Sequence, residues 1–407
     1  MSNLYELKTI NLKLKILFIS ISVFSVVLIT GCTESKKEVD SANKPKTLQH
    51  ESQKQIPPTR KQGDNGNVTS SKQTNKFYQI NLIDNNKGWA ISNNNILVKN
   101  NNQKWLDVTP SKLISLKANY LSLFSFNENI AWVAGGDTIL KTQDDGKTWK
   151  TIQIPSSNEA NKTTGVDFSF INSQTGWMLA HRGYANGHSP FDIYQTTDGG
   201  TSWELKNHVG YGTDNSNSIP DTKDPQNITF VDEKHGFITG KGNDPKEITF
   251  YKTKDSGKTW SLLNISLPSN LSDGIIGFRA PQFFNQNEGM IQVEIETMNN
   301  KFFTILYNSN DQGENWKELY KMNGTGAVIF LNKKIGWANI KTSINDTSSS
   351  TIFKTTDGGN TWEKISKLNF SLNKLKFFNS QNGWGINEKT GQLMRSIDGG
   401  VTWKATS

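Results

Sequence analysis

A turn anchored by an aromatic residue recurs along this chain, and its spacing constrains the fold more than any other feature. Six copies are variants of Ser/Thr-x-Asp-x-Gly-x-Thr/Ser/Asn-Trp, and a degenerate copy at residues 98–105 keeps only the Trp. Successive Trp residues lie 44, 54, 57, 56, 46 and 41 positions apart. A period of about 40–55 residues is typical of propellers and solenoids.

Each repeat also contains four short β-rich runs. In each repeat a polar turn is followed by a small residue and an apolar residue, as in residues 85–91. Alternating apolar runs flank this motif, and in the second repeat they lie at 120–126, 138–142 and 148–154. Four such runs bounded by turns predict a four-stranded antiparallel sheet. Seven sheets around one axis predict an all-β fold, a seven-bladed β-propeller over residues 76–407. Because the four runs of each sheet are contiguous, we expect the ring to close by side-chain packing alone.

The residues of the Asp turn suit a structural role. The Asp side chain can accept bonds from nearby backbone amides, and the Gly adopts positive φ without steric cost. The Trp is large and apolar and suits the seam between blades. A catalytic Asp on every blade would require many equivalent active sites, so we interpret these residues as structural. They are Asp144, Gly146, Trp149, Asp198, Gly200, Trp203, Asp255, Gly257, Trp260, Asp311, Gly313, Trp316, Asp357, Gly359, Trp362, Asp398, Gly400 and Trp403.

The amino terminus has the features of a secretory signal. A basic segment precedes an apolar run at 16–30, which is too short to span a bilayer as a helix, so we predict a signal peptide over 1–31. Residues 29–32, Ile-Thr-Gly-Cys, resemble the lipobox of bacterial lipoproteins, and Cys32 is the only cysteine. The resemblance implies a diacylated Cys32 that anchors the protein in the lipid bilayer on the extracytoplasmic face. Separately, the Lys-, Asn- and Ile-rich composition favours a Gram-positive bacterial source. The alternative is an incidental Cys beside an ordinary signal.

Residues 32–75 differ from the rest in composition. They are rich in Lys, Gln, Ser, Asn, Thr and Pro, which predicts a disordered tether that begins at the lipidated Cys32. The chain has a net charge of +8, but residues 76–407 carry only +3 of it. A nucleic-acid surface would need clustered basic residues, so we expect no nucleic-acid partner.

Loop lengths indicate where a binding site would lie. In a propeller blade, the loop between the second and third strands and the connection to the next blade emerge on the face opposite the Asp turns. Here these loops are long at 181–190, 209–226, 267–281 and 294–301. Long loops on a rigid scaffold usually carry binding, with solvated decoration as the alternative. The candidate binding residues are Arg182, Tyr184, His188, Tyr211, Asp214, Asp273, Arg279, Glu294 and Glu296.

Metal and cofactor motifs are missing from the sequence. His181, His188 and His208 fall around the third repeat, but their spacing matches no metal motif, and a structural zinc site would usually include Cys. The sequence contains no Gly-rich phosphate loop, HExxH or GxSxG pattern. We therefore expect no metal and no cofactor.

The repeats, as in AWVAGGDTILKTQDDGKTW at 131–149, resemble the Asp-box (BNR) repeats of sialidases, sortilin-type receptors and some glycoside hydrolases. Their pairing of Gly-Trp with Asp-Gly-Gly-x-Thr-Trp is most similar to the photosystem II stability and assembly factor family. A sialidase would need an Arg triad to hold a carboxylate, and residues 76–407 contain only Arg182, Arg279 and Arg395. The assembly factors typically display an Arg-rich patch, which this chain lacks.

Together these observations predict a monomeric, membrane-tethered, non-catalytic binding or assembly module outside the cytoplasm. Its partner would be a protein or a cell-envelope component, such as a glycan, docked on the face with the long loops. The alternative is a glycan-active hydrolase that uses acidic residues such as Asp214, Asp273, Glu294 or Glu296.

Overall fold

A computed structural model describes residues 76–93, 95–99, 105–110, 121–155, 162–183, 188–210, 219–220, 223–271 and 273–406. The predicted signal peptide, Cys32 and the tether lie outside the described residues. So do three candidate binding residues, Tyr184, Tyr211 and Asp214.

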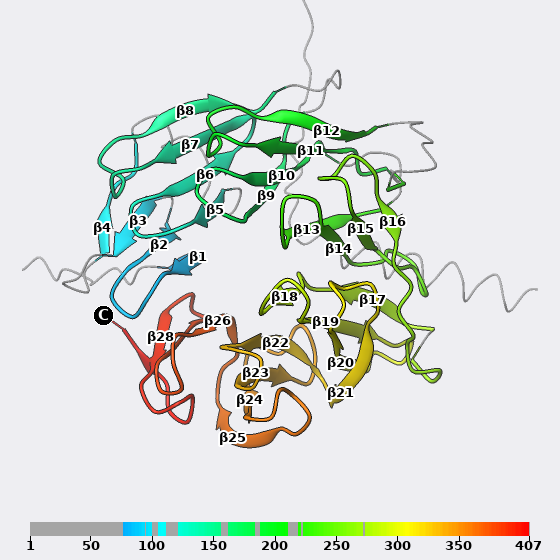
Figure 1. Ribbon diagram of the computed structural model, residues 1–407. Helices are drawn as coiled ribbons and strands as arrows, with labels where there is room; N and C mark the ends of the chain where they lie inside the picture. The colour runs from blue at the N-terminus through cyan, green and yellow to red at the C-terminus, as the bar shows by residue number, and fades with distance from the viewer. Residues whose placement is uncertain are drawn as a thin grey trace, which may run out of the picture. The chain divides into compact units, whose positions relative to one another are not determined.

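Seven antiparallel sheets follow one another around a ring, so the prediction of an all-β, seven-bladed propeller is confirmed (Figure 1). Blades 1 and 2 contain β1 (Phe77–Leu82), β2 (Gly88–Ser92), β3 (Asn95–Lys99), β4 (Trp105–Asp107), β5 (Ser122–Ser125), β6 (Ala131–Gly135), β7 (Thr138–Thr142) and β8 (Lys150–Gln153). Blades 3 and 4 contain β9 (Gly165–Phe170), β10 (Gly176–His181), β11 (Phe191–Thr196), β12 (Glu204–Val209), β13 (Pro225–Phe230), β14 (Gly236–Gly240), β15 (Phe250–Thr253) and β16 (Ser261–Leu262).

Among the described strands, blade 5 has a short fifth one, and each of the other blades has four. It contains β17 (Ile275–Phe278), β18 (Gln282–Phe283), β19 (Gly289–Glu296), β20 (Phe302–Ser309) and β21 (Lys317–Asn323). Blades 6 and 7 contain β22 (Thr325–Phe330), β23 (Gly336–Lys341), β24 (Ser350–Thr355), β25 (Glu363–Leu368), β26 (Leu372–Phe377), β27 (Gly383–Asn387), β28 (Leu393–Ser396) and β29 (Lys404–Ala405).

Two stretches expected to be loops are partly strand in blade 5. Residues 275–278 form β17, and Glu294 and Glu296 lie on β19 rather than in the loop predicted at 294–301. The reason is the alternating sequence of β19, which buries Val293 and Ile295 and leaves the two Glu side chains outside the core. The segment 279–281 then interrupts the inner strand, because β17 and β18 both pair with β19.

The described strands of each blade come from one contiguous segment, and none of them is exchanged between the first and last blades. Phe77 and Leu82 of blade 1 pack with Trp384 and Leu393 of blade 7. The expectation of side-chain packing alone was incomplete, because the Phe77 amide also donates a 2.8 Å hydrogen bond to the Gly391 carbonyl. A backbone bond therefore joins the blades at the closure.

Stacked aromatic rings pack across several of the seams between blades. Trp177 of β10 lies flat on Phe230 of the next blade, with centroids 3.7 Å apart and an interplanar angle of 4°. Trp337 stacks in the same way on Phe377, at 3.8 Å and 2°. The Asp-turn Trp403 then meets the Phe377 ring edge-on. This seam thus packs three rings from two successive blades, two of them face to face and the third edge-on.

In blades 3, 4, 6 and 7 the Gly of the Gly-aromatic pair makes room for a Phe ring of the inner strand, and in blade 1 Gly88 makes room for Leu82. A Cβ built on Gly176 would lie 2.4 Å from the ring of Phe170, and one on Gly383 would lie 2.5 Å from the ring of Phe377. Both distances are far inside van der Waals contact. The Gly of the recurring Gly-Trp sequence therefore leaves space for the Phe ring of its own blade. That Phe ring stacks on the Trp of the preceding blade, as Phe377 does on Trp337.

The Asp turns lie on the same face as the turns between the first and second strands. In blade 6, the carboxylate of Asp357 accepts hydrogen bonds from the Thr361 amide at 3.0 Å and the Thr355 hydroxyl at 2.8 Å. The next residue, Gly358, donates its amide to the Lys334 carbonyl in the other turn at 2.8 Å. This set of bonds recurs in blades 2 to 7, and we call this side of the ring the turn face. The opposite side, which carries the long loops, is the loop-rich face.

Candidate functional site

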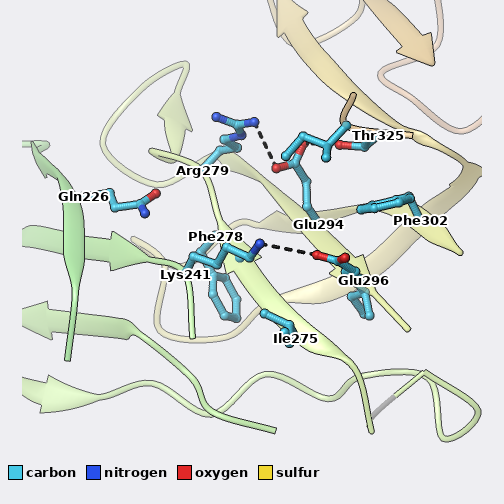
Figure 2. A pocket seen from close by; sticks show the side chains of 12 residues that line it. Gln226, Lys241, Ile275, Phe278, Arg279, Glu294, Glu296, Phe302 and Thr325 are labelled. Atoms are coloured by element: carbon cyan, nitrogen blue, oxygen red, sulfur yellow. Dashed lines mark hydrogen bonds and ion pairs between the residues drawn. The ribbon is translucent and has the colours of Figure 1, made fainter. Parts of the chain in front are cut away.

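A cleft of about 250 Å³ opens on the loop-rich face, at the ends of strands in blades 4, 5 and 6. Figure 2 shows that polar and charged side chains surround it. The residues that line it are Gln226, Lys241, Ile275, Gly277, Phe278, Arg279, Glu294, Ile295, Glu296, Phe302, Thr325 and Ile344.

Backbone contacts between blades 4 and 5 form the base of the cleft. Lys241, directly after β14, forms an isolated antiparallel bridge with Gly277 of β17. The neighbouring Gly242 amide donates a 2.8 Å hydrogen bond to the Ile276 carbonyl. These bonds hold a side chain of blade 4 directly beside the inner strand of blade 5, so the relative positions of the two walls are fixed.

Arg279 and Glu294 form one ion pair of the cleft. The Arg279 Nη2 atom lies 2.9 Å from Glu294 Oε2. The other oxygen of Glu294 accepts hydrogen bonds from the Thr325 hydroxyl at 2.9 Å and the Gln292 side-chain amide at 3.2 Å, so both oxygens of this carboxylate are engaged. The Arg279 side chain is 58% exposed, and its other N–H groups have no partner among the described residues. Glu294 therefore holds the guanidinium while one edge stays open.

Lys241 and Glu296 form a second, looser pair. Their charged atoms are 3.5 Å apart, and their side chains are 44% and 23% exposed. In Figure 2 the two ion pairs lie along the same strand, and Phe302 and Ile275 lie close to the Glu296 end. The cleft thus combines two basic groups, two acidic groups and an apolar side.

Arg182 is not on the predicted binding surface, and this corrects the sequence analysis. Its side chain is 3% exposed, and Nε lies 2.6 Å from Oδ2 of the fully buried Asp192. The remaining donors bond the Thr163 hydroxyl at 2.7 Å and the Pro155 carbonyl at 2.9 Å. The hydroxyl of Tyr194 completes the network at 2.7 Å. Arg182 is buried because its partners come from blade 2 and blade 3 together.

The other candidates are scattered. Asp273 is exposed and pairs with Lys246 at 2.8 Å, outside the cleft. His188 is half-buried in the loop between β10 and β11, and it too lies outside the cleft. Among the candidates that the structure describes, only Arg279, Glu294 and Glu296 come together, and Lys241, Gln226 and Phe302 beside them were not predicted. Among the described residues, no three His, Cys, Asp or Glu side chains gather as they would around a metal ion.

The part of the chain that the structure describes contains no helix with the length and apolarity needed to cross a bilayer.

The family model of the photosynthesis system II assembly factor YCF48 matches residues 81–186. The photosystem II assembly lipoprotein Ycf48 of Synechococcus sp. (strain CC9902) is 26% identical over 139 residues, which cover 34% of this chain and 36% of that protein. The photosystem II assembly protein Ycf48 of Thermosynechococcus vestitus is 24% identical over 313 residues, which cover 62% of this chain and 86% of that protein.

The solved structure of YCF48 from Cyanidioschyzon merolae has the same fold, with a TM-score of 0.54 and 17% identity. It aligns with 80% of this chain and 96% of its own. The chain is therefore an Asp-box seven-bladed propeller that resembles the photosystem II assembly factors, as its repeats indicate.

Proposed function

We propose that this protein is a non-catalytic binding and assembly module that docks a protein partner on its loop-rich face. The observation that carries the proposal is the cleft of blades 4 to 6, where Arg279 presents an open guanidinium edge beside further exposed polar groups. Exposed Arg residues are frequent anchors of protein interfaces. The names of the relatives as assembly factors support the same role.

The turn face offers less to a partner. The Asp357 carboxylate is occupied by hydrogen bonds from Thr355 and Thr361, and the equivalent Asp255 is occupied by Thr253 and Thr259. These groups are committed to the turns themselves. Docking on the loop-rich face leaves the repeats free to stabilise the ring.

A glycan-active hydrolase remains the alternative, and the geometry favours it less. Glycosidases place their two carboxyl groups on either side of the scissile bond. Glu294 and Glu296 lie two residues apart on one strand and share one face of it, and each is paired with a basic side chain. Cleavage of aryl-glycosides by the full-length protein, abolished by Glu296→Gln, would support the hydrolase instead.

Photo-crosslinking in cells tests the docking face. Two apolar side chains of similar size are exposed on opposite faces: Met298, 57% exposed, follows β19, and Ile397, 67% exposed, lies in the last Asp turn. A photoreactive residue at position 298 should capture a partner protein, and one at position 397 should capture none. Capture from position 397 alone would contradict the proposal.

We also propose that acylation of Cys32 anchors the protein on the outer side of the cell membrane, where it acts as a monomer. The sequence Ile-Thr-Gly-Cys supports this, and one relative is named a lipoprotein. Cys32→Ala should release the protein into the medium or leave an unprocessed precursor, as judged by fractionation and gel mobility. Normal processing with unchanged membrane retention would contradict the anchor.

A further inference from the structure

The cleft contains a guanidinium that is oriented for a carboxylate. Glu294 holds one end of the Arg279 fork, and the Thr325 hydroxyl and the Gln292 amide in turn hold Glu294. A planar guanidinium fixed on one side can form two parallel hydrogen bonds to a carboxylate on the other side. Lys241 of blade 4, which also lines the cleft, adds a second positive charge.

Glu296 makes the cleft unsuitable for a simple anion. Its Oε2 is 3.5 Å from the Lys241 ammonium, and its Oε1 has no partner among the described residues. A bound anion would compete for Lys241 and would leave a half-buried carboxylate beside another negative charge, which is unfavourable. A ligand with an ammonium group next to its carboxylate removes this conflict, because the ammonium can bind Glu296.

The dimensions favour a compact ligand. Glu294 and Glu296 are two residues apart along β19, so their α-carbons are about 6.6 Å apart on one side of the strand. The two ion pairs therefore lie at neighbouring positions on one side of the same strand. Ile275, Phe302 and the exposed Ile344 supply an apolar side for a hydrocarbon group. The volume of about 250 Å³ is that of a single small ligand.

We infer that this cleft binds a free α-amino acid with an apolar side chain. The ligand carboxylate pairs with Arg279 and Lys241, the ligand ammonium pairs with Glu296, and the side chain packs on Phe302 and Ile275. This site goes beyond the proposed docking role, and its occupation requires no partner protein.

Isothermal titration of the full-length protein tests the site with three matched probes. Leucine carries both charges, 4-methylpentanoate lacks the ammonium group, and 3-methylbutylamine lacks the carboxylate. Leucine should bind, and each analogue should bind at least about tenfold more weakly. Equal binding of leucine and either analogue, or no heat from leucine at millimolar concentration, would overturn the inference.

Two variants locate the binding within the molecule. A Cβ on Gly277 meets only ordinary contacts, the nearest being Lys241 Cγ at 3.5 Å, so Gly277→Val should fold, fill the cleft and abolish leucine binding. Arg279→Gln removes an exposed group and should weaken binding at least about tenfold. The control is Lys246→Gln on the same face, which should bind as the wild type does. Unchanged leucine binding in Arg279→Gln would show that leucine binds outside this cleft and would overturn the inference. Failed crosslinking from position 298 would contradict only the proposed docking of a partner protein.

Discussion

Replacing Trp337 with alanine should lower the free energy of unfolding by about 3–5 kcal/mol. The indole is fully buried, lies flat on Phe377 of the next blade and donates a 2.7 Å hydrogen bond to the Gly399 carbonyl. The Lys354 ammonium lies over the same indole, 5.4 Å from its ring centroid. Truncation removes all three contacts and opens a cavity between blades 6 and 7. Urea denaturation of the full-length protein, followed by fluorescence, measures the loss.

Trp403→Ala is the matched control in the same seam. This half-buried indole meets Phe377 only edge-on and bonds a carbonyl of its own turn, the Gly400 carbonyl at 3.0 Å. Its removal should destabilise the protein less than Trp337→Ala. If Trp337→Ala cost less than Trp403→Ala, stacking between blades would not be the main contact of the seam.

Arg182→Met should destabilise the protein by about 3–5 kcal/mol, although sequence analysis placed Arg182 on a surface. The change removes the cation from Asp192, which has no exposed surface, and from the Pro155 carbonyl. An isolated buried carboxylate is costly, and His208, which lies 2.6 Å from Oδ1 of Asp192, is the basic partner that remains. Thermal and urea unfolding curves of the single variant give the size of the effect.

The double variant Arg182→Met/Asp192→Asn separates burial of charge from loss of packing. Removing both charges should recover part of the stability lost in Arg182→Met, because no carboxylate is then left without its main partner. A double variant less stable than the single variant by the full cost of Asp192→Asn alone would show that the two residues act independently.

The blades could be predicted from the sequence because their signals are local. In each Asp turn the Ser or Thr, the Asp and the Gly bond one another within a few residues, as Thr253 and Gly257 do at 3.0 Å. A second local signal was missed. The turn between the first two strands always begins with Asp or Asn, whose side chain accepts two backbone amides, as Asn332 does from Lys334 and Ile335.

The site could be predicted only in part, because its contacts cross blades. Arg279 and Glu294 were among the candidates, but Lys241 belongs to blade 4 and reaches the cleft through its bridge to Gly277. No spacing in the sequence connects these positions. The burial of Arg182 was missed for the same reason, since its partner Pro155 precedes the start of blade 3.

Asp357→Ala provides the most direct test that the repeats build the ring while the loop-rich face binds. Hydrogen bonds from the Thr361 amide and hydroxyl and the Thr355 hydroxyl lower the pKa of Asp357 to about 2. The ionised carboxylate therefore stabilises the fold above the unfolded-state pKa of about 4, and this contribution is lost as the pH falls towards 2.

Stability and crosslinking are to be measured on the same Asp357→Ala protein. Its unfolding free energy should fall below that of the wild type at pH 7, and the difference should narrow as the pH falls towards the pKa of Asp357, because the charge-dependent part of the contribution is lost there. Capture of the partner from position 298 should stay at the wild-type level for the protein that remains folded. Unchanged stability together with lost capture would contradict the account.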